Sequence, residues 1–226
     1  ARVSFDITFS GGGGTFYTLG TSILNIEDNV FVGNNLALNL YANSTNILVQ
    51  GSIQGAADVV KLGSGDAYFK GALANTYTGG TFVRGGTLHL AKTANVVAIS
   101  SKLSVGESTT VSGSIVDDTA GQYPSALDAT VGAYGEWVLN NQATVTNLSL
   151  INSGPHGFYD GGSIHGSGIL TLNCDVNVTG PDVSEIFPTL YIGSQTRTFN
   201  VGQDDWYLGY FSVKSIVGTG TAGIVK

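Results

Sequence analysis

The sequence predicts an all-β fold in which short strands and tight corners are stacked as a β-solenoid. Three observations lead to this prediction. Apolar and polar residues alternate along many short segments, Gly, Asn, Asp and Ser occur between these segments, and parts of the sequence recur at long range. Short alternating segments separated by turn residues are typical of β-sandwiches, barrels and solenoids. Internal repeats favour the solenoid among these three.

The alternation places apolar side chains on one side of each expected strand. Apolar residues occupy every second position of residues 3–9, and the pattern returns around residues 36–40, 145–150 and 169–178. Because successive side chains of a strand point to opposite faces, each segment presents one apolar row to a core. The intervening Gly, Asn, Asp and Ser residues tolerate the positive φ angles of tight corners. We expect such a corner at the four glycines of residues 11–14.

Composition limits the class of protein. Hydrophobic residues make up 42% of the 226 residues and charged residues only 11%, a balance opposite to that of disordered chains. The net charge of −7, with nine Lys and Arg residues, argues against nucleic acid as a partner. No run of 18 apolar residues occurs, so we expect no membrane-spanning helix. Cys174 is the single cysteine, which excludes an internal disulfide.

The recurring segments suggest one continuous solenoid over residues 1–226. Residues 52–61 resemble residues 215–226, and residues 163–172 are a weaker third copy. We divide the chain into an N-terminal strand with its Gly-rich corner (1–20), a first repeat unit (21–94), diverged β-rich turns (95–195), and the start of a second, truncated repeat (196–226). A cut solenoid turn exposes an unpaired strand edge. We therefore expect neighbouring turns of a longer chain, or other copies placed end to end, to cover the ends.

One part of the first repeat unit has a specific motif. The motif begins with Lys-Leu-Gly-Ser-Gly at residues 61–65, continues with Asn-Thr-Tyr-Thr-Gly-Gly-Thr at 75–81, and ends with Gly-Thr-Leu at 86–88. Its defining residues are Lys61, Gly63, Gly65, Asn75, Thr76, Tyr77, Thr78, Gly79, Gly80, Thr81, Gly86, Thr87 and Leu88. This pattern resembles the autotransporter-associated β-strand repeat, also called the passenger-associated transport repeat. The match covers about residues 50–91, and Leu73 is an insertion relative to the pattern.

The resemblance implies a fold and a setting. Members of this family lie in large secreted or surface-displayed bacterial proteins whose passengers form right-handed parallel β-helices. The repeat is thought to assist passage or folding of the passenger, and it is not catalytic. The residues themselves agree with a structural role. Gly79 and Gly80 allow a corner, Thr76, Thr78 and Thr81 favour strands, and Asn75 could stack on an Asn of an adjacent turn.

Candidate catalytic and metal-binding residues are few. A polysaccharide hydrolase or lyase needs paired carboxylates on one face, and the candidates are the adjacent pairs Asp117–Asp118 and Asp204–Asp205, with Glu136 and Asp160 alone. Adjacent strand residues point in opposite directions, so we interpret both pairs as solvated turns. A single calcium site on Asp117, Asp118 or Asp204 is a weaker alternative.

The remaining polar candidates also favour structural roles. His89, His156 and His165 lack metal-ligand spacing, and we expect them to be surface or hydrogen-bonded histidines. Cys174 alternates with Leu172 and Val176, which indicates a small buried hydrophobe. We therefore predict no enzyme activity, no metal and no cofactor.

Aromatic residues give the one binding hypothesis. Aromatic pairs recur along the chain, and rows of aromatic side chains on strands can bind sugar rings. Trp206, Tyr207 and Tyr210 are the best candidates for contact with surface glycans.

Taken together, the sequence predicts a rod-like structural segment of an extracellular or outer-surface protein of a Gram-negative-type bacterium. An autotransporter passenger, an adhesin and an extracellular fibre are the settings we consider. A glycan-binding adhesive module is the alternative, and a β-helix polysaccharide-active enzyme is a weaker third hypothesis.

Overall fold

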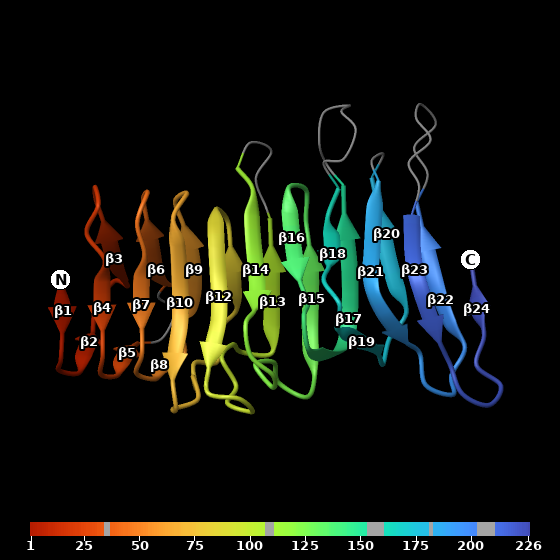
Figure 1. The fold of residues 1–226 in the computed structure, drawn as a ribbon, viewed down its shortest axis with the longest axis horizontal. Coiled ribbons are helices and arrows are strands. Elements are labelled where there is room, and N and C mark those ends of the chain that lie inside the picture. The colour runs from red at the N-terminus through yellow and green to blue at the C-terminus, as the bar shows by residue number, and fades with distance from the viewer. Residues whose placement is uncertain (34–36, 107–110, 153–160, 181–182, 203–210) are drawn as a thin grey trace.

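The computed structural model describes residues 1–33, 37–106, 111–152, 161–180, 183–202 and 211–226. The described chain is all-β and forms a parallel β-solenoid of about nine turns, which confirms the fold class predicted from the sequence. The two termini lie at opposite ends of the stack (Figure 1). Within the described ranges there is no helix with the length and apolar character needed to cross a membrane.

Two long faces of the solenoid are built from parallel strands that pair with the strand one turn away. The first face contains β1 (Arg2–Val3), β4 (Leu24–Ile26), β7 (Ile47–Val49), β10 (Asp66–Gly71), β12 (Gly86–Lys92), β14 (Gly113–Asp117), β16 (Gly135–Val138), β18 (Ser163–His165), β21 (Ser184–Tyr191) and β23 (Phe211–Val217). The second face contains β3 (Gly14–Thr18), β6 (Ala37–Ala42), β9 (Asp58–Leu62), β11 (Thr81–Val83), β13 (Lys102–Val105), β15 (Leu127–Val131), β17 (Gln142–Ile151), β20 (Val176–Thr179), β22 (Arg197–Val201) and β24 (Ile224–Val225).

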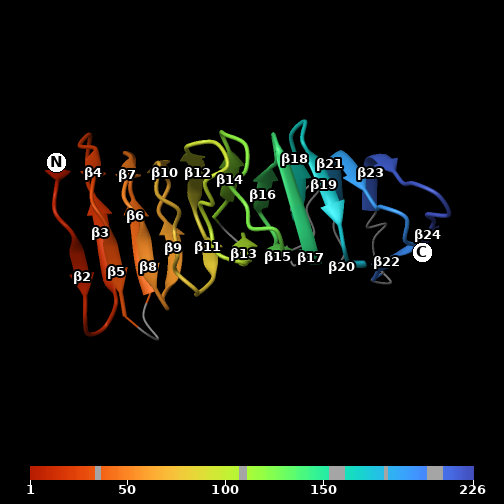
Figure 2. The ribbon, with the colours of Figure 1, turned by 90° about the horizontal axis from the view of Figure 1, so that it is seen from below.

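Shorter strands complete the cross-section. β2 (Ile7–Phe9), β5 (Val30–Val32) and β8 (Ile53–Gly55) form a third face over the first turns, where they lie side by side at one edge (Figure 2). β19 (Ile169–Leu172) pairs with the first half of β17 and the second half of β21. Both β17 and β21 therefore contribute to two faces along their length.

The core is a set of columns in which the same inward position recurs from turn to turn. On the second face, one column runs through Leu40, Lys61, Val83, Val105, Val131, Leu150 and Val178. On the first face, another runs through Ile47, Ala67, Leu88, Ile115, Trp137, Ile164 and Ile186. All of these side chains are buried, and they belong to or lie within one continuous core. Parallel strands stack about 4.8 Å apart, so each turn adds one layer to this core.

The N-terminal alternation does not form the single strand that its pattern indicates. The structure ends β1 at Val3 and starts β2 at Ile7, with a bend between them. Phe5 lies in this bend and is 66% exposed, so it does not belong to the inward row. The bend is fixed by Asp6, whose carboxylate accepts a hydrogen bond of 3.0 Å from the amide of Asn29 one turn away. A two-residue period cannot reveal such a corner, because the alternation continues through it.

The glycine run does form a corner. Gly12 and Gly13 have φ angles of +139° and +83°, and β3 starts at Gly14. A Cβ atom on Gly13 would come 2.7 Å from the carbonyl oxygen of Ala37 in the next turn. The corner therefore needs glycine both for its backbone angles and for its close approach to the next turn.

Candidate functional site

Lys61 is the first motif residue, and its ammonium group is buried in the solenoid. Its side chain is 0% exposed, and Nζ donates hydrogen bonds to the carbonyl oxygens of Leu62, Gly63 and Gly85 at 2.9, 3.0 and 2.8 Å. Burial lowers the pKa of Lys61 to about 8, and the nearby Asp66 carboxylate opposes this shift. All three protons of the ammonium have acceptors, so Lys61 ties the corner after β9 to the corner one turn later.

The motif glycines surround this lysine. Gly63 and Gly86 have φ angles of +77° and +61°. A Cβ on Gly86 would come 2.2 Å from the Gly65 carbonyl oxygen and 2.8 Å from the Nζ of Lys61. A Cβ on Gly65 would come 2.3 Å from the carbonyl oxygen of Thr45, one turn away. The three glycines therefore let the corner carbonyls approach one another and Lys61.

Asn75 connects three turns through its amide. Its Oδ1 accepts a hydrogen bond from the amide of Ile53 at 2.9 Å, and its Nδ2 donates to the carbonyl oxygen of Ala98 at 2.6 Å. Its partners are thus main-chain groups, and the expected stacking on another asparagine is wrong for this residue. A side-chain amide contact of that kind occurs between Asn177 and Asn200, at 3.0 Å.

The rest of the motif forms an extended segment followed by a strand. Tyr77 is buried and shares a hydrogen bond with the hydroxyl of Thr81, the first residue of β11. Thr76 and Thr78 are exposed and lie between strands, contrary to their β-forming character, although their amides donate to Ile53 and Gly55 of the neighbouring turn.

The last motif positions also pack between turns. A Cβ on Gly79 would come 2.2 Å from the carbonyl oxygen of Ala57, and one on Gly80 would meet the ring of Phe82. Thr87 pairs with Asp66 and Ser114 in the sheet, and Leu88 is fully buried. The inserted Leu73 is 56% exposed. The motif residues thus contact adjacent turns of this chain.

A second buried lysine was not singled out by sequence reasoning. Lys92 is 0% exposed, and its Nζ donates to the carbonyl oxygens of Gly51 and Lys70 at 3.1 and 3.0 Å. Burial lowers its pKa to about 8. The signal was present, because Lys92 continues the inward alternation of Leu88 and Leu90.

The adjacent carboxylates Asp117 and Asp118 point in opposite directions, as their positions in a strand predict. Asp117 is 1% exposed, and its carboxylate accepts hydrogen bonds from the amides of Asn140 and Asn141 at 2.6 and 2.9 Å. Burial raises the pKa of this carboxyl, and those hydrogen bonds oppose the rise. The interpretation of Asp117 as a solvated turn residue is therefore wrong, because it continues the inward column through Phe69 and Leu90.

Asp118 and the described histidines lie on the outer surface. Asp118 contacts Nδ1 of His89 at 3.1 Å, and the His89 ring stacks on Tyr68 with a centroid distance of 4.3 Å. His165 contacts Glu136 at 3.1 Å. No group of three or more His, Cys, Asp or Glu side chains with metal-binding geometry occurs among the residues that the structure describes.

His156, Asp160, the pair Asp204–Asp205 and the glycan candidates Trp206, Tyr207 and Tyr210 lie outside the described residues. Cys174 is described, and it is half-buried against the core, where burial raises its pKa to about 11.

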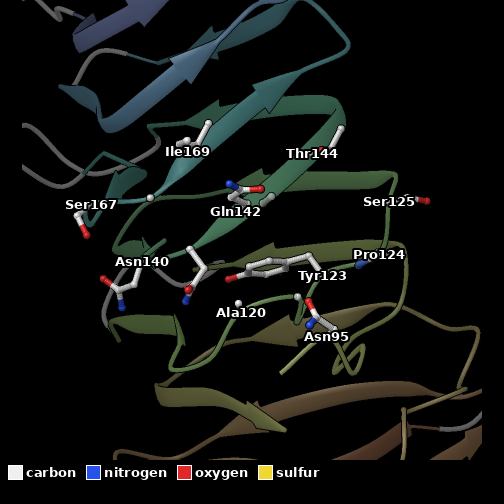
Figure 3. A pocket seen from close by; sticks show the side chains of 14 residues that line it. Asn95, Ala120, Tyr123, Pro124, Ser125, Asn140, Gln142, Thr144, Ser167 and Ile169 are labelled. Atoms are coloured by element: carbon white, nitrogen blue, oxygen red, sulfur yellow. The ribbon is translucent and has the colours of Figure 1, made fainter. Parts of the chain in front are cut away.

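A surface groove lies beside Asp117, and sequence reasoning did not find it. It has a volume of about 590 Å³ and lies where the corners of four successive turns meet (Figure 3). The turns contribute Asn95, residues 120–121 and 123–125, residues 140–144 and residues 167–169. The side chains that line it carry amide, hydroxyl and apolar groups, and none of these described lining residues is charged.

The wall of the groove is fixed by buried contacts. Gln122 is 0% exposed, accepts a hydrogen bond from the amide of Lys92 at 3.1 Å, and donates to the Lys92 carbonyl oxygen at 3.3 Å. Tyr123 packs edge-on against Trp137, and its hydroxyl accepts a hydrogen bond from the indole at 2.8 Å. Because these residues are anchored in the core, the groove is preformed.

Comparison with known proteins does not assign this chain to a family. No family model matches the chain. No curated protein and no solved structure matches it either.

Proposed function

We propose that this chain is a structural, rod-like segment of a large secreted or surface-displayed bacterial protein. The observation that carries the proposal is the use of the motif residues. Lys61, Asn75 and the motif glycines contact adjacent turns of the stack. Residues that resemble those of a passenger repeat therefore serve here to hold turns together.

The surroundings of the motif support the same proposal. The inward columns continue through the turns before and after it with buried Leu, Val and Ile. A stack of this kind gains stability with each added turn, since each turn buries its faces against two neighbours. It can therefore extend to a length set by the number of turns.

We further propose that the solenoid pairs at its ends with neighbouring turns of a longer chain or with other copies. The terminal strands present exposed apolar side chains, including Ile216, Val217, Ile224 and Val225 at 38–51% exposure. Leu19 and Ile23 are exposed near the other end at 65% and 49%. An autotransporter-type passenger, an adhesin or an extracellular fibre on the outer surface of a Gram-negative-type bacterium is the setting that the motif resemblance favours.

A replacement experiment within the native polypeptide tests the spacer role. Residues 1–226 are exchanged either for an unrelated parallel β-solenoid with the same number of turns or for a Gly/Ser linker of the same residue count. Epitopes at both ends of the segment report surface display on intact cells, and a fluorophore pair reports the end-to-end distance. We expect the substitute solenoid to preserve display and distance, and the linker to give short, broad distances. Loss of display with the substitute solenoid would overturn the spacer role.

A further inference from the structure

We propose that the groove formed by residues 95, 120–121, 123–125, 140–144 and 167–169 binds a neutral oligosaccharide. This proposal concerns other residues than the aromatic candidates at 206–210, and it goes beyond the role of a spacer.

The lining offers hydrogen-bonding groups without charge. Asn95, Gln142 and Ser167 present amide and hydroxyl groups, and Tyr123 and Ile169 add apolar surface (Figure 3). Amides and hydroxyls donate and accept hydrogen bonds, which matches the hydroxyl-rich edge of a sugar. Small apolar surfaces suit the C–H faces of sugar rings. An acidic glycan would find no cation among the described lining residues, and the chain carries a net charge of −7.

Gln142 and Ser167 are free to bind. Both are exposed, and in the described part of the chain neither side chain has a hydrogen-bond partner within the protein. Asn140 and Asn141 differ, because they use their backbone amides, and weakly their side-chain amides, to hold Asp117. Asn140 and Asn141 therefore have a structural role in the groove, whereas Gln142 and Ser167 can contact a ligand.

Backbone amides at two corners of the groove are already paired, which argues against a peptide strand as the ligand. The amide of Asn95 donates to Ala120, that of Ile169 to Asn141 and that of Gly168 to Leu139, at 2.8, 2.8 and 2.9 Å. Addition of a peptide strand requires an unpaired sheet edge. The available contacts come from side chains, as expected for a sugar site.

The shape of the groove suits a short chain that runs parallel to the solenoid axis. Its volume of about 590 Å³ lies within the range of roughly 300–1,000 Å³ typical of ligand pockets. Four successive corners at the strand spacing of about 4.8 Å span roughly 14 Å. The core contacts of Gln122 and Tyr123 hold one wall in place before the ligand arrives, which lowers the ordering cost of binding.

Saturation-transfer NMR and calorimetry on the full chain test this proposal. The probes are short neutral gluco-, manno-, galacto- and xylo-oligosaccharides at millimolar concentration, with oligogalacturonate as the acidic counterpart. We expect saturable binding of at least one neutral probe, unchanged by added salt. Gln142→Ala should weaken it about fivefold, the effect of losing one hydrogen bond of about 1 kcal/mol, and Gln142→Ala with Ser167→Ala should weaken it further.

Gln54→Ala is the matched control, because Gln54 is a partly exposed glutamine on β8, outside the groove. It should bind like the wild type, and unchanged melting temperatures would show that all variants fold. The proposal is overturned if no neutral probe binds, if oligogalacturonate is preferred, or if the Gln142 variants bind as well as the wild type. Binding that is lost in Trp206→Ala but kept in the groove variants would also contradict it, since it would assign the sugar to residues 206–210.

Discussion

Lys61 occupies a core position whose neighbours one turn before and after are Leu40 and Val83. Burying an ammonium group is costly unless its protons have acceptors. At Lys61 the cost is offset by three carbonyl oxygens, which belong to corners where the sheet leaves carbonyls available. Lys92 uses the same chemistry with two carbonyls, and Asp117 uses its inverse with two backbone amides. Single charged residues thus join the turns at corners.

Lys61→Met should lower the free energy of unfolding by about 1–3 kcal/mol, because buried carbonyl oxygens lose their donor. Urea denaturation at neutral pH measures the change. Lys102→Met is the control, since Lys102 is exposed and contacts the face of Phe82, and an exposed substitution of this kind stays within about 0.5 kcal/mol. Equal effects of the two substitutions would contradict the role assigned to the Lys61 ammonium.

The pH dependence of the same comparison has a defined sign. In the unfolded chain Lys61 keeps its proton up to the ordinary pKa of 10.5, whereas in the folded chain it releases it at about 8. Between these values the unfolded state binds more protons, so the contribution of Lys61 to stability rises with pH. The difference in unfolding free energy between wild type and Lys61→Met should therefore grow from pH 8 towards pH 10. Taking the difference cancels the titration of Cys174 and the tyrosines.

The motif and the alternation predict where the buried charged residues lie, but not which groups they bind. The motif identified Lys61, and the two-residue period places Lys92 and Asp117 inward as well, although Asp117 was expected in a solvated turn. Their partners could not be predicted, because Lys92 binds the carbonyl of Gly51, which is 41 residues away along the chain. Only the stacking of turns brings such groups together.

At the scale of strands and corners, glycine sets how closely successive turns approach. Gly86 has a φ of +61°, and a Cβ atom added there would come 2.2 Å from the Gly65 carbonyl oxygen. Gly20 has a similar φ of +69°, but a Cβ there would meet nothing within 4 Å. Comparison of Gly86 with Gly20 therefore distinguishes the free-energy cost of the positive φ angle from the cost of a steric clash between corners.

Gly20→Ala should lower stability by about 1–2 kcal/mol, the cost of placing a side chain in the left-handed region. Gly86→Ala should cost clearly more, because the corner around Lys61 must also move apart. Thermal and urea unfolding of both variants give the comparison. Similar losses in the two variants would show that contact between the corners adds nothing to the requirement for glycine.

The sequence predicted strands better than corners. The expected inward rows are present at Leu38 and Leu40, at Leu148 and Leu150, and at Leu170, Leu172, Val176 and Val178, because period-two alternation depends only on local geometry. The bend at Ser4–Asp6 and the non-strand positions of Thr76 and Thr78 depend on the neighbouring turn, which local pattern does not record. The groove was unpredictable for the same reason, since its lining comes from four turns and its wall is fixed by Gln122.

At the scale of the whole molecule, parallel pairs follow one another along the whole second face, with a register shift between Leu127 and Asp128 where β15 meets β17. One column of paired residues passes from Thr15 through Asn39, Val60, Phe82, Ser104, Thr130, Ser149 and Asn177 to Asn200. Every step in this column joins two strands that pair in parallel. The distance between the two ends of the column is therefore the number of steps multiplied by the spacing between neighbouring strands. A rod with a length set by its number of turns is the central claim of this account.

The distance between spin labels at Thr15 and Asn200, measured by pulsed electron paramagnetic resonance, tests that claim most directly. Eight steps of about 4.8 Å predict a separation near 38 Å. A second pair at Thr15 and Thr130 spans five steps and should give about 24 Å. Narrow distributions that increase in this proportion are the predicted result. A Thr15–Asn200 distance no longer than the Thr15–Thr130 distance, or a broad distribution for either pair, would contradict a rigid parallel stack.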